Sequence, residues 1–175
     1  MTTKQGKGRW SALFISQSAM IAAIYVVLTY VFAPISFGAI QFRIAEALTI
    51  LPIFTPAAVP GLFVGCLIGN ILGGAMLPDI IFGSIATLIG AVLTYLLRNK
   101  SPFIAVLPPI LSNTLIIPFI LYYTYGVQMF FLLIVLTVFV GEVGSCGVLG
   151  LTLCFALKKY KGLFPNKKEK NKEQE

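Results

Sequence analysis

Histidine is absent from the 175-residue chain, and its absence excludes several kinds of chemistry. A Ser-His dyad, a zinc site that uses histidine and haem ligation by histidine all require this residue. The chain also lacks a G-x-x-x-x-G-K-[S/T] motif, so it has no P-loop with which to hold ATP phosphates. Histidine-dependent catalysis and P-loop ATP hydrolysis are therefore excluded for this chain.

Charged residues are also scarce: they make up 11% of the chain, whereas hydrophobic residues make up 58%. A soluble domain usually carries about 25% charged residues, because its surface must stay hydrated. The formal net charge of +7 comes from basic residues that occur in blocks along the sequence. Such blocks are typical of membrane orientation rather than of nucleic-acid binding. The composition therefore predicts an integral membrane protein in the cell membrane, with no nucleic-acid partner.

The cysteines are few and have no metal-binding or redox spacing. Cys66, Cys146 and Cys154 lie inside apolar segments, and no C-x-x-C motif occurs. An odd number of buried thiols is typical of helix packing rather than of disulfides or a metal site. We therefore expect these side chains to pack between helices.

Long uncharged stretches predict six membrane-spanning helices. A membrane helix needs about 20 mostly apolar residues. One uncharged stretch is divided by the proline cluster Pro52, Pro56 and Pro60, through which a single helix does not continue. Another is divided at Tyr122–Gly126, whose tyrosines suit a membrane interface. The predicted spans are 11–32, 44–54, 61–77, 79–97, 103–121 and 130–157.

Two of these spans have unusual features. The span 44–54 is short for a full crossing. The span 103–121 contains three prolines that are expected to kink it, namely Pro108, Pro109 and Pro118.

The distribution of basic residues predicts the orientation. With six spans, 12 of the 13 Lys and Arg residues lie on the side of the two termini, and Arg43 lies on the other side. A five-span arrangement would move Arg98 and Lys100 to the side opposite the N-terminus. The positive-inside rule therefore favours a compact all-α bundle of six transmembrane helices with both termini in the cytoplasm. The expected parts are a cytoplasmic segment 1–10, a transmembrane substrate-binding domain 11–157 and a disordered basic tail 158–175.

Polar residues inside or beside the spans indicate a binding pocket. A charge at the centre of a membrane helix costs about 2.5–3.5 kcal/mol on insertion scales, so such residues are usually functional. The candidate substrate-binding residues are Gln41, Arg43, Glu46, Asn70, Asp79, Asn113 and Glu142. The predicted topology places them in the outer half of the bundle, and the inner half is nearly all apolar. This arrangement predicts a polar pocket that opens to the outside.

Most of these residues also have a structural interpretation. Asp79 opens a span and is suited to cap a helix N-terminus. Arg43 and Glu46 are three residues apart and are spaced to form a local ion pair. Asn70 and Asn113 are suited to hydrogen bonds between helices.

Glu142 is harder to explain as a structural residue. Its own span contains no cation, and Gly141 and Gly144 flank it and leave space beside the carboxylate. An isolated buried carboxylate must find donors, a counter-charge or a proton. We therefore expect Glu142 to contact a ligand directly.

Small residues recur at helical spacing in two spans. One row repeats every four residues along the span 61–77, and it consists of Gly61, Gly65, Gly69 and Gly73. Such a row lets a neighbouring backbone approach closely. In the span 11–32, Ala19 and Ala23 are four apart, and so are Ser18 and Ala22. Packing within the bundle is the simplest interpretation of these pairs.

Three segments resemble the queuosine-precursor transporters, the QueT family. They are Pro34–Pro52 (PISFGAIQFRIAEALTILP), Pro60–Asn70 (PGLFVGCLIGN) and Asp79–Gly90 (DIIFGSIATLIG). Gly141 and Glu142 in the last span also fit the family. The resemblance covers nearly the whole chain apart from its two tails.

The resemblance implies a substrate-binding S component of an energy-coupling-factor (ECF) transporter. Such components have six helices and bind a vitamin-like compound from outside. They require a separate transmembrane coupling subunit and two cytosolic ATPase subunits, which agrees with the missing P-loop. Ala19 and Ala23 resemble the small residues that dock on the coupling subunit. No cofactor, metal or catalytic residue is implied.

The first hypothesis is therefore capture of a 7-deazaguanine precursor of queuosine. Its ring N–H and exocyclic amine, and the ammonium of an aminomethyl form, need carboxylate and amide acceptors. Phe37, Phe42 or Tyr123 is suited to stack on the ring. The alternatives are another vitamin-like solute or a small ion-coupled carrier, which would need a polar path below Glu142 that the sequence lacks. An intramembrane enzyme is disfavoured, because histidine and paired intramembrane Asp residues are absent.

Overall fold

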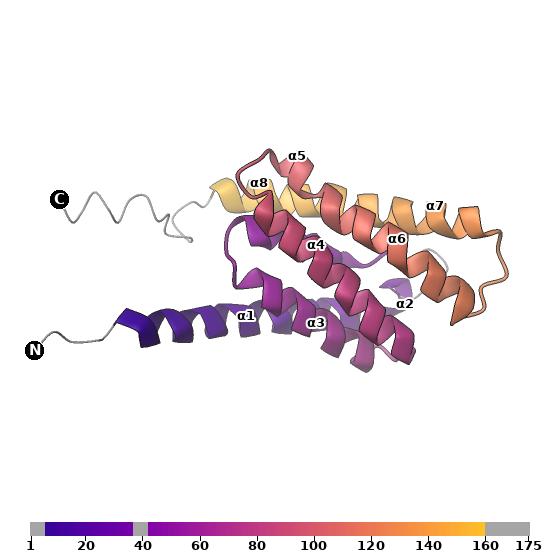
Figure 1. Ribbon diagram of the computed structural model, residues 1–175, viewed down its shortest axis with the longest axis horizontal. Coiled ribbons are helices and arrows are strands. Elements are labelled where there is room, and N and C mark those ends of the chain that lie inside the picture. Colours follow the sequence, from indigo (N-terminus) through magenta and orange to yellow (C-terminus); the bar gives the residue numbers. More distant parts are fainter. Residues whose placement is uncertain (1–5, 37–41, 160–175) are drawn as a thin grey trace, which may run out of the picture.

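The computed structural model describes residues 6–36 and 42–159, with side chains from residue 12 onward. These residues form helices and no strand (Figure 1), which confirms the all-α prediction. The elements are α1 (Gly6–Val31), α2 (Ala33–Ser36), η1 (Ile44–Ile53), α3 (Ala58–Leu72), η2 (Asp79–Gly83), α4 (Ser84–Leu96), α5 (Pro102–Ala105), α6 (Leu107–Tyr123), α7 (Phe131–Glu142), η3 (Val143–Leu149) and α8 (Gly150–Lys159). The element η1 is a 3₁₀-helix, and η2 and η3 are π-helical.

Several of these helices are long and apolar enough to cross a membrane. Among the described residues there are four: Ala12–Val31, Asp79–Leu96, Pro102–Tyr123 and Phe131–Lys159. The segments η1 and α3 are apolar but shorter. Each predicted span coincides with one of these helical segments, and the chain is a multi-pass membrane protein. The count of six crossings and the cytoplasmic location of the termini stay predictions.

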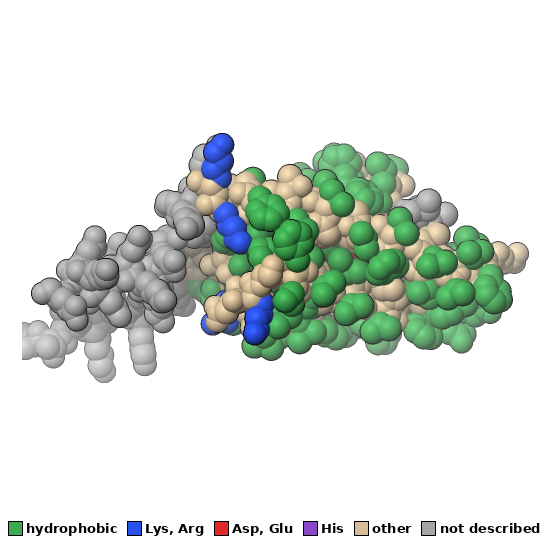
Figure 2. Space-filling model, turned by 90° about the horizontal axis from the view of Figure 1, so that it is seen from above, with side chains coloured by type: hydrophobic (Ala, Val, Ile, Leu, Met, Phe, Trp, Pro, Cys, Tyr) green, Lys and Arg blue, Asp and Glu red, His purple; other side chains and the backbone are tan. Residues whose placement is uncertain are grey.

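The surface of the bundle is mostly apolar. Figure 2 shows hydrophobic side chains over most of the visible face, and Lys and Arg side chains gathered near one end. The start of α1 and the end of α8 lie at the same end of the bundle (Figure 1). The exposed basic residues Arg98, Lys100, Lys158 and Lys159 belong to the α4–α5 connection and to the end of α8. An apolar surface with basic residues at one end is typical of a protein embedded in lipid.

The short helix η1 lies at the centre of the bundle, where it contacts α1, α3, α4, η3 and α8. Seven of its ten residues are buried, so its neighbours separate it from the surrounding lipid. A 3₁₀-helix rises about 2.0 Å per residue, so ten residues extend about 20 Å instead of the 15 Å of an α-helix. The central position and the extended helix explain how a segment of this length fits a membrane bundle.

The glycine row of α3 packs directly against α1. Three of its members face α1, namely Gly61, Gly65 and Gly69. A Cβ atom on Gly61 would lie 2.7 Å from the Ser18 carbonyl oxygen, and one on Gly65 would lie 2.8 Å from the Tyr25 Cβ. Real Cβ atoms do not approach other heavy atoms so closely, and the predicted close approach is confirmed at these positions. Gly73 has a different role, because it caps the C-terminus of α3.

The predicted end of the third span at Leu77 is wrong, because α3 ends at Leu72. Gly74 has a φ of 75°, a left-handed conformation that glycine adopts without strain. The Ala75 N–H donates to the Asn70 carbonyl over 2.9 Å, and the Gly74 N–H donates to the Ile71 carbonyl over 3.2 Å. This Schellman arrangement satisfies the terminal carbonyls and stops the helix.

The prolines of the fifth span act at two places. The helix is interrupted at Val106, and α6 begins with Pro108 and Pro109 in its first turn. Proline is tolerated there because the first N–H groups of a helix have no intrahelical acceptor. The sequence predicts a kink at these prolines; the structure instead breaks the helix just before Pro108 and Pro109, and α6 continues through Pro118.

We expect Gly65→Ala to lower the stability of the protein, because the new methyl group would overlap α1. Overpacking of this kind typically costs about 1–3 kcal/mol. The matched control is Gly147→Ala, where the nearest atom to the new Cβ is 3.7 Å away. Thermal unfolding of both variants in detergent should show a lower Tm for Gly65→Ala alone. Equal Tm values would mean that α1 and α3 separate easily at this position.

Candidate functional site

Four charged residues lie buried inside the bundle. Arg43, Glu46, Asp79 and Glu142 are 4%, 0%, 0% and 4% exposed. Arg43 precedes η1 and Glu46 lies within it, whereas Asp79 opens η2 and Glu142 ends α7. Segments that are far apart in the sequence therefore bring their charges into one region, as the topology predicts.

Arg43 and Asp79 form an ion pair between η1 and η2. The Arg43 Nη2 donates to Asp79 Oδ2 over 3.2 Å and to Oδ1 over 3.3 Å. The ion pair of Arg43 thus reaches across to another helix, beyond the local pairing with Glu46 that the spacing suggests. Asp79 does open a helix, as the capping interpretation requires, but its carboxylate accepts from Arg43 rather than from its own helix.

Tyr125, in the connection between α6 and α7, supports this ion pair. Its hydroxyl donates to Asp79 Oδ2 over 3.2 Å and accepts the Met76 N–H over 3.1 Å. Partial burial raises the pKa of the Tyr125 phenol, so the hydroxyl keeps its proton at neutral pH and can donate it. Tyr125 therefore fixes Asp79 from a third direction.

The Glu46 carboxylate is only partly satisfied. Its Oε1 accepts from the Tyr25 hydroxyl and, over 3.2 Å, from the Thr87 hydroxyl. Its Oε2 is buried and has no hydrogen-bond partner among the described residues. A buried acceptor without a donor is costly, so this oxygen keeps the capacity to accept a further hydrogen bond.

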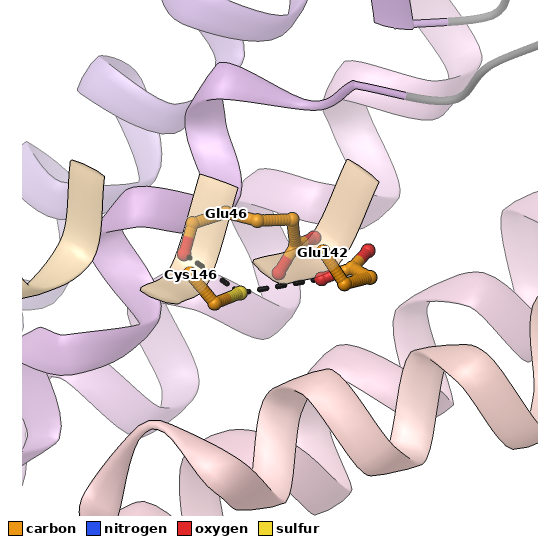
Figure 3. Close-up of side chains that lie close together, drawn as sticks. All are labelled: Glu46, Glu142 and Cys146. Atoms are coloured by element: carbon orange, nitrogen blue, oxygen red, sulfur yellow. Dashed lines mark hydrogen bonds between the residues drawn. The ribbon is translucent and has the colours of Figure 1, made fainter. Parts of the chain in front are cut away.

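The Glu142 carboxylate has a partner for each oxygen. The Asn113 amide donates to Oε1 over 3.0 Å, and the Cys146 thiol donates to Oε2 over 3.2 Å. The thiol also lies 3.5 Å from the Glu46 carbonyl oxygen, as Figure 3 shows. Cys146 therefore links Glu142 to η1. The prediction that the cysteines serve helix packing describes Cys146 incompletely.

Glu46, Glu142 and Cys146 form one compact cluster (Figure 3). A carboxylate oxygen of each glutamate and the thiol sulfur all lie within 4.8 Å of one another. Two ionised carboxylates at this separation repel one another strongly in a medium of low dielectric constant. These three residues are therefore suited to hold a cation or several N–H donors, and among the described residues they are the ones placed to hold a metal ion.

The space that Gly144 leaves is occupied by an aromatic ring. A Cβ atom on Gly144 would lie 2.5 Å from Cε2 of Phe42, so the glycine makes room for this ring. Phe42 therefore packs against the helix that carries Glu142, two residues after that glutamate. Phe37 and Gln41 lie outside the described residues. Tyr123 is 77% exposed on the surface of α6 and therefore lies outside the buried carboxylate cluster.

The two asparagines join helices. The Asn70 amide donates to the Asp79 carbonyl over 3.4 Å and thereby links α3 to η2. The Asn113 amide links α6 to α7 through Glu142. Both contacts agree with the structural interpretation of these residues, and both also hold the acidic residues in place.

Every irregular helix carries a residue of the site. Glu46 lies in the 3₁₀-helix η1, Asp79 in the π-helical η2 and Cys146 in the π-helical η3. Isolated π-helical turns occur often at functional sites, because the wider turn changes the direction of the side chains that follow. The departures from α-helix thus coincide with the polar cluster.

Sequence reasoning missed several uncharged members of the site. They are Tyr25, Thr49, Thr87, Tyr125 and Cys146. A signal existed for Thr87, because Gly83, Thr87, Gly90 and Thr94 form a row of small and hydroxyl residues on one buried face. Cys146 is one helical turn beyond Glu142, which is also a usable signal.

The two small-residue pairs of α1 face different surroundings. Ala22 is 8% exposed and packs against Gly65. Ala19 and Ala23 are exposed on the outer side of α1. The packing interpretation is therefore confirmed for Ala22, whereas Ala19 and Ala23 remain available to a partner.

We expect Tyr125→Phe to destabilise the protein, because it removes a hydrogen bond to the carboxylate of Asp79. Hydrogen bonds to charged groups contribute about 1.5–3 kcal/mol. The matched control is Tyr123→Phe, two residues earlier on the exposed surface of α6. Chemical or thermal unfolding in detergent should reveal a loss for Tyr125→Phe and almost none for Tyr123→Phe. Equal stability of the two variants would show that Tyr125 is not needed to hold Asp79.

Comparison with known proteins assigns this arrangement to a family. The chain is 37% identical over 84 residues to the queuosine precursor transporter QueT of Lactococcus lactis subsp. cremoris (strain MG1363). That alignment covers 47% of this chain and 49% of the relative, so it spans about half the length of each protein. No solved structure matches the chain. The family model of the QueT transporter matches residues 15–159, so the chain belongs to the QueT transporter family, a family of transporters and not of enzymes.

Proposed function

We propose that the chain is the substrate-binding S component of an ECF-type importer in the cell membrane, and that it captures a 7-deazaguanine precursor of queuosine. The observation that carries the proposal is the buried cluster of carboxylate acceptors around Glu46 and Glu142. The name of the related protein supports a queuosine precursor as the substrate. The absence of a P-loop supports a division of labour with separate ATPase subunits.

The chemistry of the cluster suits such a substrate. A 7-deazaguanine offers several N–H donors, and hydrogen bonds from N–H groups to carboxylates are strong because they are charge-assisted. One oxygen of Glu46 has no donor among the described residues. Glu142 accepts its hydrogen bonds from neutral groups, the amide of Asn113 and the thiol of Cys146. A substrate N–H can replace these neutral donors, and Phe42, which packs at Gly144 on the same helix as Glu142, is the described aromatic residue that we assign to stack on the flat heterocycle.

Two observations favour an S component over an ion-coupled carrier. Gly61, Gly65 and Gly69 of α3 face Ser18, Ala22 and Thr29 in this order, so α3 runs parallel to α1. Asp79 follows the end of α3, so the ion pair of Asp79 with Arg43 lies in the half away from the start of α1. Among the described residues nearer the termini, the buried polar side chains are neutral, as Thr55 and Thr94 illustrate. A carrier would need a path of ionisable groups through this half.

The exposed face of α1 supports a protein partner. The side chains of Ala19 and Ala23 are small, so the backbone of another helix can approach the outer surface of α1 closely at this point. The opposite face of the same helix is occupied by the glycines of α3. We assign Ala19 and Ala23 to docking on the transmembrane coupling subunit of the transporter.

Glu142→Gln should lose most of the affinity for a 7-deazaguanine, because one acceptor oxygen becomes a donor. Loss of a charge-assisted hydrogen bond typically costs about 1.5–3 kcal/mol, or roughly 10- to 150-fold in Kd. Isothermal titration calorimetry of the purified variant measures this change. The control is Thr152→Val, at an exposed position further along the same long helix. If the Gln variant is well folded and binds like the wild type, Glu142 is a structural residue. If no 7-deazaguanine binds to the wild type, the substrate is another vitamin-like solute.

Replacing Ala19 and Ala23 together by Leu should abolish uptake by cells and keep ligand binding by the purified chain. The added side chains would separate two closely packed helices. Met20→Leu with Ile24→Leu is the matched control, because these residues are also exposed on α1 and four apart. A pull-down with the coupling subunit reports on docking directly. An intact complex in the Ala variant would refute the docking assignment, and uptake without any complex would favour the ion-coupled carrier.

A further inference from the structure

The transmembrane region contains more buried negative charge than positive charge. Between residues 10 and 97, and between 101 and 157, the sequence has one basic residue, Arg43, and three acidic residues, Glu46, Asp79 and Glu142. All four are buried. The segment 37–41, which the structure does not describe, contains no charged residue. When all the carboxylates are ionised, the region therefore carries a net charge of −2.

The surplus charge belongs to Glu46 and Glu142. Arg43 forms its ion pair with Asp79 and also attracts Glu46 and Glu142, but its single positive charge cannot balance three carboxylates. The donors on the other two carboxylates bring no positive charge, because they are the hydroxyls of Tyr25 and Thr87, the amide of Asn113 and the thiol of Cys146. Neutral dipoles reduce the cost of burying a charge, but they do not cancel the repulsion between two carboxylates.

The geometry of the pair fits a single nitrogen. One oxygen of each carboxylate lies within 4.8 Å of the other. A nitrogen that stands about 2.8 Å from each of two acceptors spans up to about 5.6 Å between them. Within the described part of the chain the Oε2 of Glu46 has no donor, so the pair keeps the capacity to accept a hydrogen bond from such a nitrogen. A neutral N–H edge would satisfy the hydrogen bond but would leave the surplus charge in place.

We propose that Glu46 and Glu142 together form a subsite for a primary ammonium group of the substrate, and that this subsite selects cationic over neutral 7-deazaguanines. The proposal rests on the proposed function for the heterocycle itself. An ammonium supplies three N–H donors and one positive charge. It can therefore donate hydrogen bonds to both carboxylates and also reduce their surplus negative charge. A proton on the pair reduces the charge as well, but it does not distinguish one substrate from another.

The test compares two ligands with the same ring system. One carries an aminomethyl group at position 7, which is an ammonium at neutral pH, and the other carries a nitrile there, which is neutral. Calorimetry on the purified wild-type chain, in buffer with EDTA, should give an affinity at least about tenfold higher for the ammonium ligand. Glu46→Gln and Glu142→Gln should each reduce this preference to about twofold or less.

The possible results separate this proposal from the proposed function. If both ligands bind equally well, the chain still captures 7-deazaguanines, and the ammonium subsite is refuted. If the preference persists in well-folded Glu46→Gln and Glu142→Gln, the subsite lies elsewhere and the assignment to this pair is wrong. If the ammonium ligand binds only after EDTA is replaced by a divalent metal salt, a metal ion neutralises the two glutamates instead of the substrate, and the ammonium subsite is refuted. If neither ligand binds under any condition, both proposals are wrong. The wild-type comparison needs no variant, so it decides the matter even if a substitution prevents folding.

Discussion

Charged groups buried in an apolar bundle must be satisfied by the protein itself, because lipid offers them neither water nor counter-ions. Most of the architecture follows from this requirement. The ion pair of Arg43 and Asp79 joins the starts of η1 and η2, and Tyr125 binds Asp79 from the connection between α6 and α7. Glu46 and Glu142 need donors from α1, α4, α6 and η3, so these helices have to meet at one point.

The central 3₁₀-helix and the π-helical turns make this meeting possible. A regular α-helix repeats its side-chain directions every 3.6 residues, which restricts the groups that face one another. The altered turns in η1, η2 and η3 place Glu46, Asp79 and Cys146 toward common neighbours. The glycines at positions 61 and 65 add a second adjustment, because they bring α1 close enough for the Tyr25 hydroxyl to reach Glu46. Helix distortion and close packing thus serve the same polar cluster.

The sequence predicts the location of the helices well, because hydrophobic length, proline clusters and glycine rows are local signals. The sequence also predicts that the acidic and amide residues lie close together in the folded protein. In the predicted topology each of them is located in the outer half of its own span. The pairing of Arg43 with Asp79 was beyond reach, because the partners are 36 positions apart and no local spacing connects them. Tyr25, Thr87 and Cys146 were missed because single hydroxyl and thiol groups are common in packed membrane helices. The π-helical turns depend on tertiary contacts, so periodicity does not reveal them.

The position of Tyr25 on α1 has a consequence for communication within the protein. The outward-facing Ala23 is two residues from Tyr25, a rise of about 3 Å along the helix. Tyr25 contacts Gly65 through its Cβ and Glu46 through its hydroxyl, so a shift of α1 displaces a donor of the acidic cluster. A binding event on the outer face of α1 that shifts this helix would therefore be thermodynamically linked to events at Glu46. Such linkage is reciprocal: if binding at one site changes the affinity of the other site by some factor, binding at the other site changes the affinity of the first by the same factor.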